Sequence, residues 1–432
     1  MTHPITTDAL RVGMFIHLNT GWMKHPFPLS SFKLISQDQI DTIRGLGLSG
    51  LTWSPERSEL ELQDADSAGS ASSASALLDA EARADEAGPA QIDPRQAARL
   101  ALAAQRELMN RCERQFIEAC RDLRRTTDKA LTDPAQARAD AQTLAQALLD
   151  KMLVEGEPCL RVLGEMGTDR AATHAMNVTV IALMLARQLE VPQAMLLDLG
   201  VGSLLHDIGK VAIPDRVRLP REDFSAAEAA IYRDHVAQGL LMARRMGLSS
   251  EAQLVIAQHH ELADGTGFPS ALMLQRMSLA ARIVAMVNRY DNLCNAATPA
   301  QSLTPHEALS RMFAQSRNKF DQVLLNGFIK MMGIYPPGSI VQLNDERYGM
   351  VMTVNAAHPL KPRVLVFDPG VPADEALHLD LEKLPTLGIR RSLRAAQMPV
   401  RAAEYLRPRQ RVAYFFDVEP APAVQEPDEV SA

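Results

Sequence analysis

The chain has 432 residues, which corresponds to two to four domains at roughly 100–200 residues per domain. Its 45 basic and 52 acidic side chains give a net charge of −7, which argues against a dedicated nucleic-acid-polymer binder because such proteins carry basic patches. Hydrophobic residues make up 47% of the chain, enough for sizeable cores. No window approaches 18 uncharged apolar residues, so no membrane span is expected.

The cysteines and the start of the chain predict a cytoplasmic protein. The four cysteines are scattered without a Cys-x-x-Cys pair, and Cys112 and Cys120 are too far apart in a helical pattern to form a local bridge. Reduced thiols are typical of cytosolic proteins. The first residues lack a basic flank followed by an apolar run, so they do not predict a secretory signal.

Residues 1–63 are expected to form a small α+β module. A strand-like run covers residues 11–18, and a helix is predicted over 36–46, with a serine at its start and glycines near its end. Residues 64–91 are rich in Ala, Ser, Asp and Glu, and they have too little large apolar surface to offset the entropy cost of ordering. We interpret them as a flexible linker.

Residues 92–154 are predicted to form amphipathic helices. Asp133 and Pro134 are typical of an N-cap and the first helical residue, so they separate two helices. In the first helix apolar residues recur at steps of three and four. Such a face either covers a neighbouring core or pairs two chains, and the second alternative would make the protein a homodimer. The face contains Leu100, Ala104, Leu108, Cys112, Phe116, Cys120 and Leu123.

Residues 155–335 keep a helical pattern and are predicted to form an all-α domain of seven or eight helices. Capping boxes at Ser225–Glu228 and Thr304–Glu307 mark two helix starts. After residue 335 the pattern alternates with β-branched residues, as in strands. The fold class is therefore mainly α. A short β element at 336–412, with strands over 339–343, 348–354 and 362–367, and a disordered tail at 413–432 are expected to follow.

Five of the histidines in the helical region, out of 11 in the chain, accompany two short motifs. A lone histidine on an apolar helix face is usually a core residue. Adjacent helical positions diverge by about 100°, however, so His259 and His260 cannot both fill one core position. Imidazoles with a carboxylate suit divalent transition metals such as Fe, Mn, Co, Ni or Zn. The candidate ligands are His174, His206, Asp207, His235, His259 and His260.

Six protein donors, with water and phosphate oxygens, are enough for two metal ions. A carboxylate next to a histidine can bridge such a pair. Two metals about 3.5–4 Å apart hold the attacking and leaving oxygens of a displacement at phosphorus. The constellation therefore indicates hydrolysis of a phosphate ester.

The motifs resemble, in their order along the chain, those of the HD-GYP family of phosphohydrolases. Phe268 stands where the family has its name-giving Tyr. Val12–Phe15 and Trp22–Phe27 resemble the small module that often precedes such domains. The matching segments, from about 170 to 343, are His174-x-x-Asn177-Val178, His206-Asp207-Ile208-Gly209-Lys210, His235-x-x-x-Gly239, His259-His260-Glu261, Asp264-Gly265-x-Gly267-Phe268-Pro269 and Tyr335-Pro336-Pro337-Gly338-Ser339.

The resemblance implies an HD-type helical fold and a bacterial, metal-dependent phosphodiesterase that hydrolyses cyclic di-GMP to pGpG or GMP. It implies that the six candidates are metal ligands, with Asp207 bridging two divalent ions, Fe or Mn. Lys210 would lie beside the phosphate and stabilise its developing charge. Gly267, Phe268 and Pro269 would form a loop at the substrate.

Two departures from the family bear on activity. The family has an Asp ligand where this chain has Asn288, whose neutral amide coordinates metals more weakly; Asp291 would compensate only if the helix end rearranged. The family's basic, phosphate-contacting segment corresponds to residues 296–301, which contain no cation, so Arg289 or Arg282 would have to replace it. The alternatives are a catalytically degenerate domain that binds a nucleotide or a signalling partner, or another phosphohydrolase substrate.

Overall fold

The structure, a computed structural model, describes residues 2–18, 31–34, 36–45, 50–58, 93–153, 157–164, 169–219, 221, 224–315, 317–354, 360–408 and 411–419. The chain divides into two compact units, one of residues 1–25 and 29–107 and one of residues 26–28 and 108–432. The expected linker at 64–91 and the Trp22–Phe27 motif lie outside the described residues. None of the described helices has the length and apolar surface to span a membrane.

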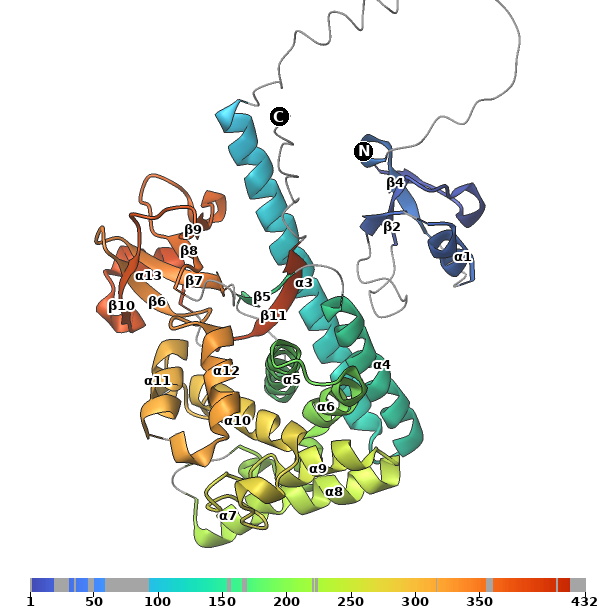
Figure 1. Cartoon of the computed structure of the whole chain (residues 1–432), viewed down its shortest axis with the longest axis vertical. Helices are drawn as coiled ribbons and strands as arrows, with labels where there is room; N and C mark the ends of the chain where they lie inside the picture. Colours follow the sequence, from blue (N-terminus) through green and yellow to red (C-terminus); the bar gives the residue numbers. More distant parts are fainter. Residues whose placement is uncertain are drawn as a thin grey trace, which may run out of the picture. The chain divides into compact units, whose positions relative to one another are not determined.

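The first unit contains a small antiparallel sheet with strand order β1-β4-β2-β3, accompanied by one helix (Figure 1). Ile16 of the sheet and Ile40 and Ile43 of the helix are fully buried, so one apolar face of each element forms the core. This confirms the predicted α+β character. The elements are β1 (His3–Pro4), β2 (Phe15–His17), β3 (Ser31–Lys33), α1 (Gln37–Gly45) and β4 (Thr52–Ser54).

Two helices, α3 (Pro94–Lys129) and α4 (Pro134–Met152), occupy the region predicted to be amphipathic. The Asp133 side chain accepts a hydrogen bond from the Gln136 amide at 3.1 Å, so the predicted N-cap is confirmed. Phe116 is fully buried, whereas Leu100 is 58% exposed. The predicted apolar face is therefore covered towards the end of α3 and exposed near its start.

The helical part of the second unit is built around α5, whose residues are buried almost continuously from Ala175 to Ala186 (Figure 1). Neighbours on several sides cover it, including α6, α10 and α12. Both predicted capping boxes are present, at Ser225–Glu228 and at Thr304–Glu307. The prediction of seven or eight helices is confirmed by α5 (Arg170–Gln188), α6 (Gln193–Leu205), α7 (Ala226–Arg233), α8 (His235–Met246), α9 (Ser250–Gln258), α10 (Leu279–Cys294), α11 (Pro305–Gln315) and α12 (Gln322–Met332).

A seven-stranded antiparallel sheet completes this unit, in the order β10-β6-β7-β5-β11, with β8 on β7 and β9 on β8. It includes β5 (Glu157–Val162) and β11 (Tyr414–Glu419). Its β-branched and leucine side chains form a separate core that includes Val341, Val351 and Val364. The predicted strands are confirmed within a residue or two. The elements are β6 (Ile340–Leu343), β7 (Tyr348–Val354), β8 (Arg363–Val366), β9 (Leu379–Asp380), β10 (Ile389–Leu393) and a short helix, α13 (Val400–Leu406).

Two predictions about this unit are wrong. Residues 157–162 are strand β5 (Glu157–Val162), not helix, and residues 414–419 of the expected disordered tail are strand β11 (Tyr414–Glu419). The two strands pair with each other, and the aromatic residues Tyr414, Phe415 and Phe416 are fully buried. Burial of this aromatic run offsets the entropy cost of ordering the segment. The last 13 residues lie outside the described part.

The strand β11 is also joined to the central helix α5. The Asn177 side chain accepts a hydrogen bond from the Tyr414 amide and donates one to the Val412 carbonyl, both at 2.8 Å. The same amide group donates to Asp291 of α10 at 2.7 Å. Asn177 therefore ties the end of the chain to two helices that carry candidate site residues.

Candidate metal centre

Three of the candidate histidines have the same local arrangement. The Nδ1 atoms of His206, His235 and His259 each face the backbone carbonyl oxygen three residues earlier, at Ser203, Tyr232 and Ile256. Because a carbonyl only accepts hydrogen bonds, each Nδ1 carries the proton and donates it. The Nε2 atom of each ring is left with a lone pair, as a metal ligand requires.

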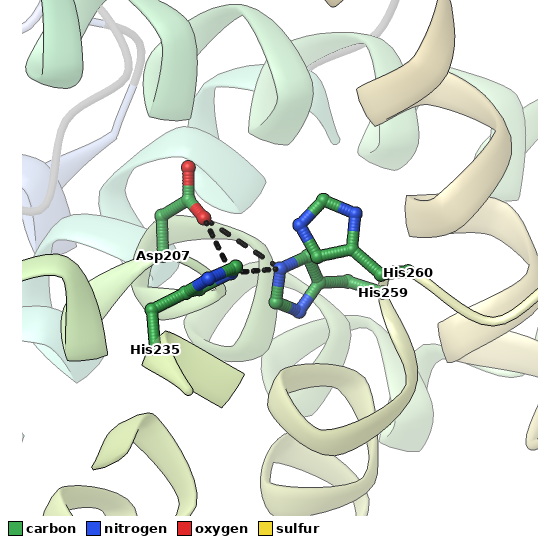
Figure 2. A group of neighbouring side chains, drawn as sticks. All are labelled: Asp207, His235, His259 and His260. Carbon is green, nitrogen blue, oxygen red and sulfur yellow. Dashed lines mark hydrogen bonds and ion pairs between the residues drawn. The ribbon is translucent and has the colours of Figure 1, made fainter. Parts of the chain in front are cut away.

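The three rings come from different places in the fold. His206 follows the end of α6, His235 is the first residue of α8, and His259 follows the end of α9. Their three Nε2 atoms converge on Asp207, which directly precedes a short 3-10 turn. Figure 2 shows this arrangement for His235 and His259. Helix ends, rather than helix faces, therefore position these donors.

The carboxylate of Asp207 faces two groups of histidines with its two oxygens. Its Oδ1 atom lies 3.4 Å from His235 Nε2 and 3.6 Å from His259 Nε2. Its Oδ2 atom lies 3.4 Å from His206 Nε2 and 3.6 Å from His174 Nε2. Asp207 is thus shared by two clusters, one completed by His235, His259 and His260 and the other by His174 and His206.

The contacts within the clusters need a cation to be favourable. His174 Nε2 lies 3.2 Å from His206 Nε2, and His235 Nε2 lies 3.3 Å from His259 Nε2. Lone pairs face each other in both contacts because the protons are on the Nδ1 atoms. In the described part of the chain, the buried atoms Asp207 Oδ1 and His260 Nε2 have no hydrogen-bond partner. Buried polar atoms without partners are costly, so this donor set fits divalent metal ions.

Burial keeps three of the histidines neutral, namely His235, His259 and His260. It lowers the pKa of His259 to about 3, and it also lowers the pKa of His235 and that of His260. Burial acts to raise the pKa of Asp207, but the charge of Lys210 holds it well below its usual range. Neutral imidazoles around an ionised carboxylate are the protonation states that bind a metal.

Lys210 lies at the edge of the centre. Its Nζ atom donates a hydrogen bond to Asp207 Oδ2 at 2.6 Å, and it lies 5.6 Å from the centre of the Tyr232 ring. Burial acts to lower the pKa of Lys210, but the charge of Asp207 raises it overall, so the side chain stays an ammonium. Asp207, Lys210 and His174 all line one cavity.

The Gly267–Pro269 loop lies against the centre through Phe268. The Phe268 ring stacks on the His260 ring, with centroids 4.4 Å apart and an angle of 21° between the planes. The buried carboxylate of Glu261 accepts hydrogen bonds from the amides of Ser270 and Leu272, at 2.7 and 2.8 Å. Glu261 therefore anchors the end of this loop, a function that the sequence motif alone did not reveal.

Asn288 is buried near the centre. Its Nδ2 atom faces the His259 carbonyl oxygen at 3.5 Å, and its Oδ1 atom accepts a hydrogen bond from Asn292 at 2.6 Å. The neighbouring helical turn presents Asp291, whose Oδ2 accepts a hydrogen bond from His174 Nδ1 at 2.6 Å. Asp291 thus orients a histidine of the cluster without any change in the helix, which the sequence did not anticipate.

Not every histidine of the helical region belongs to the centre. His306 donates from Nδ1 to the Ile334 carbonyl at 2.8 Å and stacks on Tyr335. It lies in neither of the two clusters.

Replacing Asp291 by Asn is expected to lower metal affinity 10–100-fold, as is typical when the partner of a metal-binding histidine is lost. The Asn side chain keeps the shape, but its neutral amide fixes the protonated Nδ1 of His174 less well. Titration with Mn²⁺ followed by calorimetry measures the change. Asp150→Asn, on α4 and bonded only to Gln146 among the described residues, is the matched control. Unchanged affinity in the Asp291 variant would contradict the orienting function.

Two family models match the chain. The HD domain model covers residues 158–324, and a domain of unknown function (DUF3391) covers residues 2–141. The first range holds every residue of the two histidine clusters. The second spans the small sheet, the region of the expected linker and α3.

The curated proteins that are similar to the chain include three cyclic di-GMP phosphodiesterases. A cyclic di-GMP phosphodiesterase of Pseudomonas aeruginosa is 31% identical over 374 residues, which is 85% of each chain. A cyclic di-GMP phosphodiesterase response regulator of Xanthomonas campestris is 30% identical, over 35% of this chain and 40% of its own length. A cyclic di-GMP phosphodiesterase of Borreliella burgdorferi is 22% identical, over 44% of this chain and 50% of its own length. The last two therefore match this chain over half of their length or less.

Proposed function

The chain belongs to the HD-GYP family, and we propose that it is a metal-dependent phosphodiesterase that hydrolyses cyclic di-GMP in bacterial signalling. The observation that carries the proposal is the convergence of five histidines on the two oxygens of Asp207. The similarity to a cyclic di-GMP phosphodiesterase over 85% of both chains supports the choice of substrate.

The proposed ligands are His174, His206, Asp207, His235, His259 and His260, around two divalent transition-metal ions, Fe or Mn. Asp207 would bridge the ions, since its Oδ1 faces one cluster and its Oδ2 the other. Asn288 would contribute at most a weak donor, because its oxygen already accepts a hydrogen bond from Asn292. When bound, such ions lower the pKa of a water and polarise a phosphate.

In the proposed reaction, water adds to one phosphorus and the bond from that phosphorus to the 3′ oxygen breaks. A proton from the water ends on the leaving 3′ oxygen, so the product is the linear dinucleotide pGpG, and a second hydrolysis would yield GMP. Lys210 stabilises the negative charge that develops on the phosphate oxygens, because its ammonium lies at the cavity wall beside Asp207. Gly267, Phe268 and Pro269 do not line the cavity; through the ring of Phe268, which stacks on His260, their loop would approach the substrate from the side of that cluster.

The proposal is tested by metal analysis together with turnover of cyclic di-GMP, for the wild type and for Asn288→Asp. We expect at least one metal ion per chain and measurable hydrolysis in the wild type. The added carboxylate of Asn288→Asp should tighten metal binding about tenfold, because an anionic oxygen replaces an amide. Asn110→Asp, on an exposed position of α3, adds the same charge away from the centre and should change nothing.

Fewer than one metal ion per chain and no hydrolysis in the wild type would refute the enzyme proposal. Hydrolysis that appears only in Asn288→Asp would instead identify a domain silenced at one position. The protein would then act by binding a nucleotide or a signalling partner.

A further inference from the structure

A cavity of about 1050 Å³ opens beside the metal centre, at the upper end of the range for ligand pockets. One wall carries His174, Asp207 and Lys210, so one phosphate of a substrate can reach the proposed reaction site there. Cyclic di-GMP carries two phosphodiester groups, and only one is cleaved at a time. The second group, with its full negative charge, must be accommodated elsewhere in the cavity.

The segment 296–301 offers no positive charge for this second group. Ala296, Ala297 and Gln301 line the cavity, and none is a cation. Arg170 holds the segment in place by donating hydrogen bonds to the carbonyls of Asn295 and Ala297, at 2.9 and 3.1 Å. Its guanidinium is therefore already engaged by the backbone.

Arg282 is also unsuitable. It donates to the Met277 carbonyl at 3.0 Å and pairs with Asp321 at 3.3 Å. It does not line the cavity. Of the two arginines that the sequence offered as replacements for the missing basic segment, only Arg289 has the right position.

Two arginines on neighbouring helices face the cavity without a compensating acid. Arg289 of α10 and Arg311 of α11 both line the cavity, and among the described residues no carboxylate forms an ion pair with either. Helices α10 and α11 pack against each other and both arginine side chains are exposed, so both guanidinium groups can reach an anion that enters the cavity. Two unbalanced cations at a cavity wall are stabilised when an anion lies between them.

We propose that Arg289 and Arg311 form a second phosphate subsite, which binds the phosphodiester group of cyclic di-GMP that is not being cleaved. The inference rests on the proposed function for the identity of the ligand. The pair takes the place of the basic residues missing from segment 296–301, with charge supplied from two helices instead of one loop. Guanidinium groups suit this task because they donate two parallel hydrogen bonds to phosphate oxygens.

The test compares the wild type with Arg289→Gln, Arg311→Gln and the double variant, all loaded with Mn²⁺. We expect the KM for cyclic di-GMP to rise about tenfold in each single variant and about a hundredfold in the double variant, because each loses a charge-assisted hydrogen bond. The kcat should stay within about twofold, because the reacting phosphate is held elsewhere. Arg289→Lys should recover part of the KM.

A small substrate separates this subsite from damage to the metal centre. Bis(4-nitrophenyl) phosphate has one phosphodiester group and cannot occupy both sites, so its hydrolysis should be the same in all variants. Arg245→Gln, at an exposed position of α8 that does not line the cavity, is the matched control and should leave both substrates unaffected. Equal losses on both substrates, or an unchanged KM in the double variant, would overturn the inference.

Calorimetry with cyclic di-GMP separates failure of this inference from failure of the proposed function. If the wild type binds cyclic di-GMP without hydrolysing it and the double variant binds about a hundredfold more weakly, the enzyme proposal fails and the subsite is supported. If the wild type hydrolyses cyclic di-GMP and the arginine variants match it in KM and in affinity, the subsite is refuted and the enzyme proposal stands.

Discussion

Asp207→Asn is expected to reduce turnover of cyclic di-GMP at least about 1000-fold, a loss of about 4 kcal/mol in transition-state stabilisation. The substitution keeps the shape of the side chain but removes its charge. The two carboxylate oxygens lie 3.4–3.6 Å from four histidine Nε2 atoms. Among the described residues, Asp207 alone belongs to both clusters. Metal content, measured after gel filtration, should fall below one tenth of the wild-type value.

The Asp207→Asn variant also affects Lys210, so the experiment needs a control for folding. Asp207 accepts a hydrogen bond from the Lys210 ammonium at 2.6 Å, so the variant leaves a half-buried cation without its partner. Circular dichroism and thermal unfolding of the metal-free proteins show whether the fold survives. Asp150→Asn serves again as the control because its carboxylate lies away from the cavity. A folded Asp207→Asn variant with full metal content would show that Asp207 is not a bridging ligand.

Gly209→Ala is expected to destabilise the second unit by about 3 kcal/mol and to remove most of the activity. A Cβ atom at Gly209 would lie 1.9 Å from the His235 carbonyl oxygen and 2.4 Å from the Gly239 amide nitrogen. Both neighbours are backbone atoms, so a change of side-chain rotamer cannot relieve the contact. Helix α8 would have to move, and His235 would move with it, away from Asp207.

The control for this substitution is Gly388→Ala, where a new Cβ meets nothing within 4 Å. It should change the free energy of unfolding by no more than about 0.5 kcal/mol. Urea unfolding and turnover of cyclic di-GMP are measured for both variants. If Gly209→Ala kept wild-type stability and activity, α8 could shift without a cost in free energy. The close packing of α8 on the 3-10 turn that contains Gly209 would then not position His235.

Much of the helical architecture could be predicted from the sequence because its signals are local. The capping box at Ser225–Glu228 and the Asp133 N-cap each depend on residues within one helical turn. The strand at Tyr348–Val354 was recognisable from its alternation alone. The strands β5 and β11 were not, because each is short and ordered only by strands about 190 to 260 residues away in the sequence.

The sequence by itself determined the chemistry of the centre: five imidazoles and one carboxylate, in an order that resembles the HD-GYP family. Their residue types and spacing carry this information without a structure. The fold alone decided how Asp207 divides its oxygens between two clusters, that Asp291 orients His174, and that Arg289 rather than Arg282 reaches the cavity. These properties depend on which helices pack together, and residues more than a hundred positions apart meet only when the whole core forms.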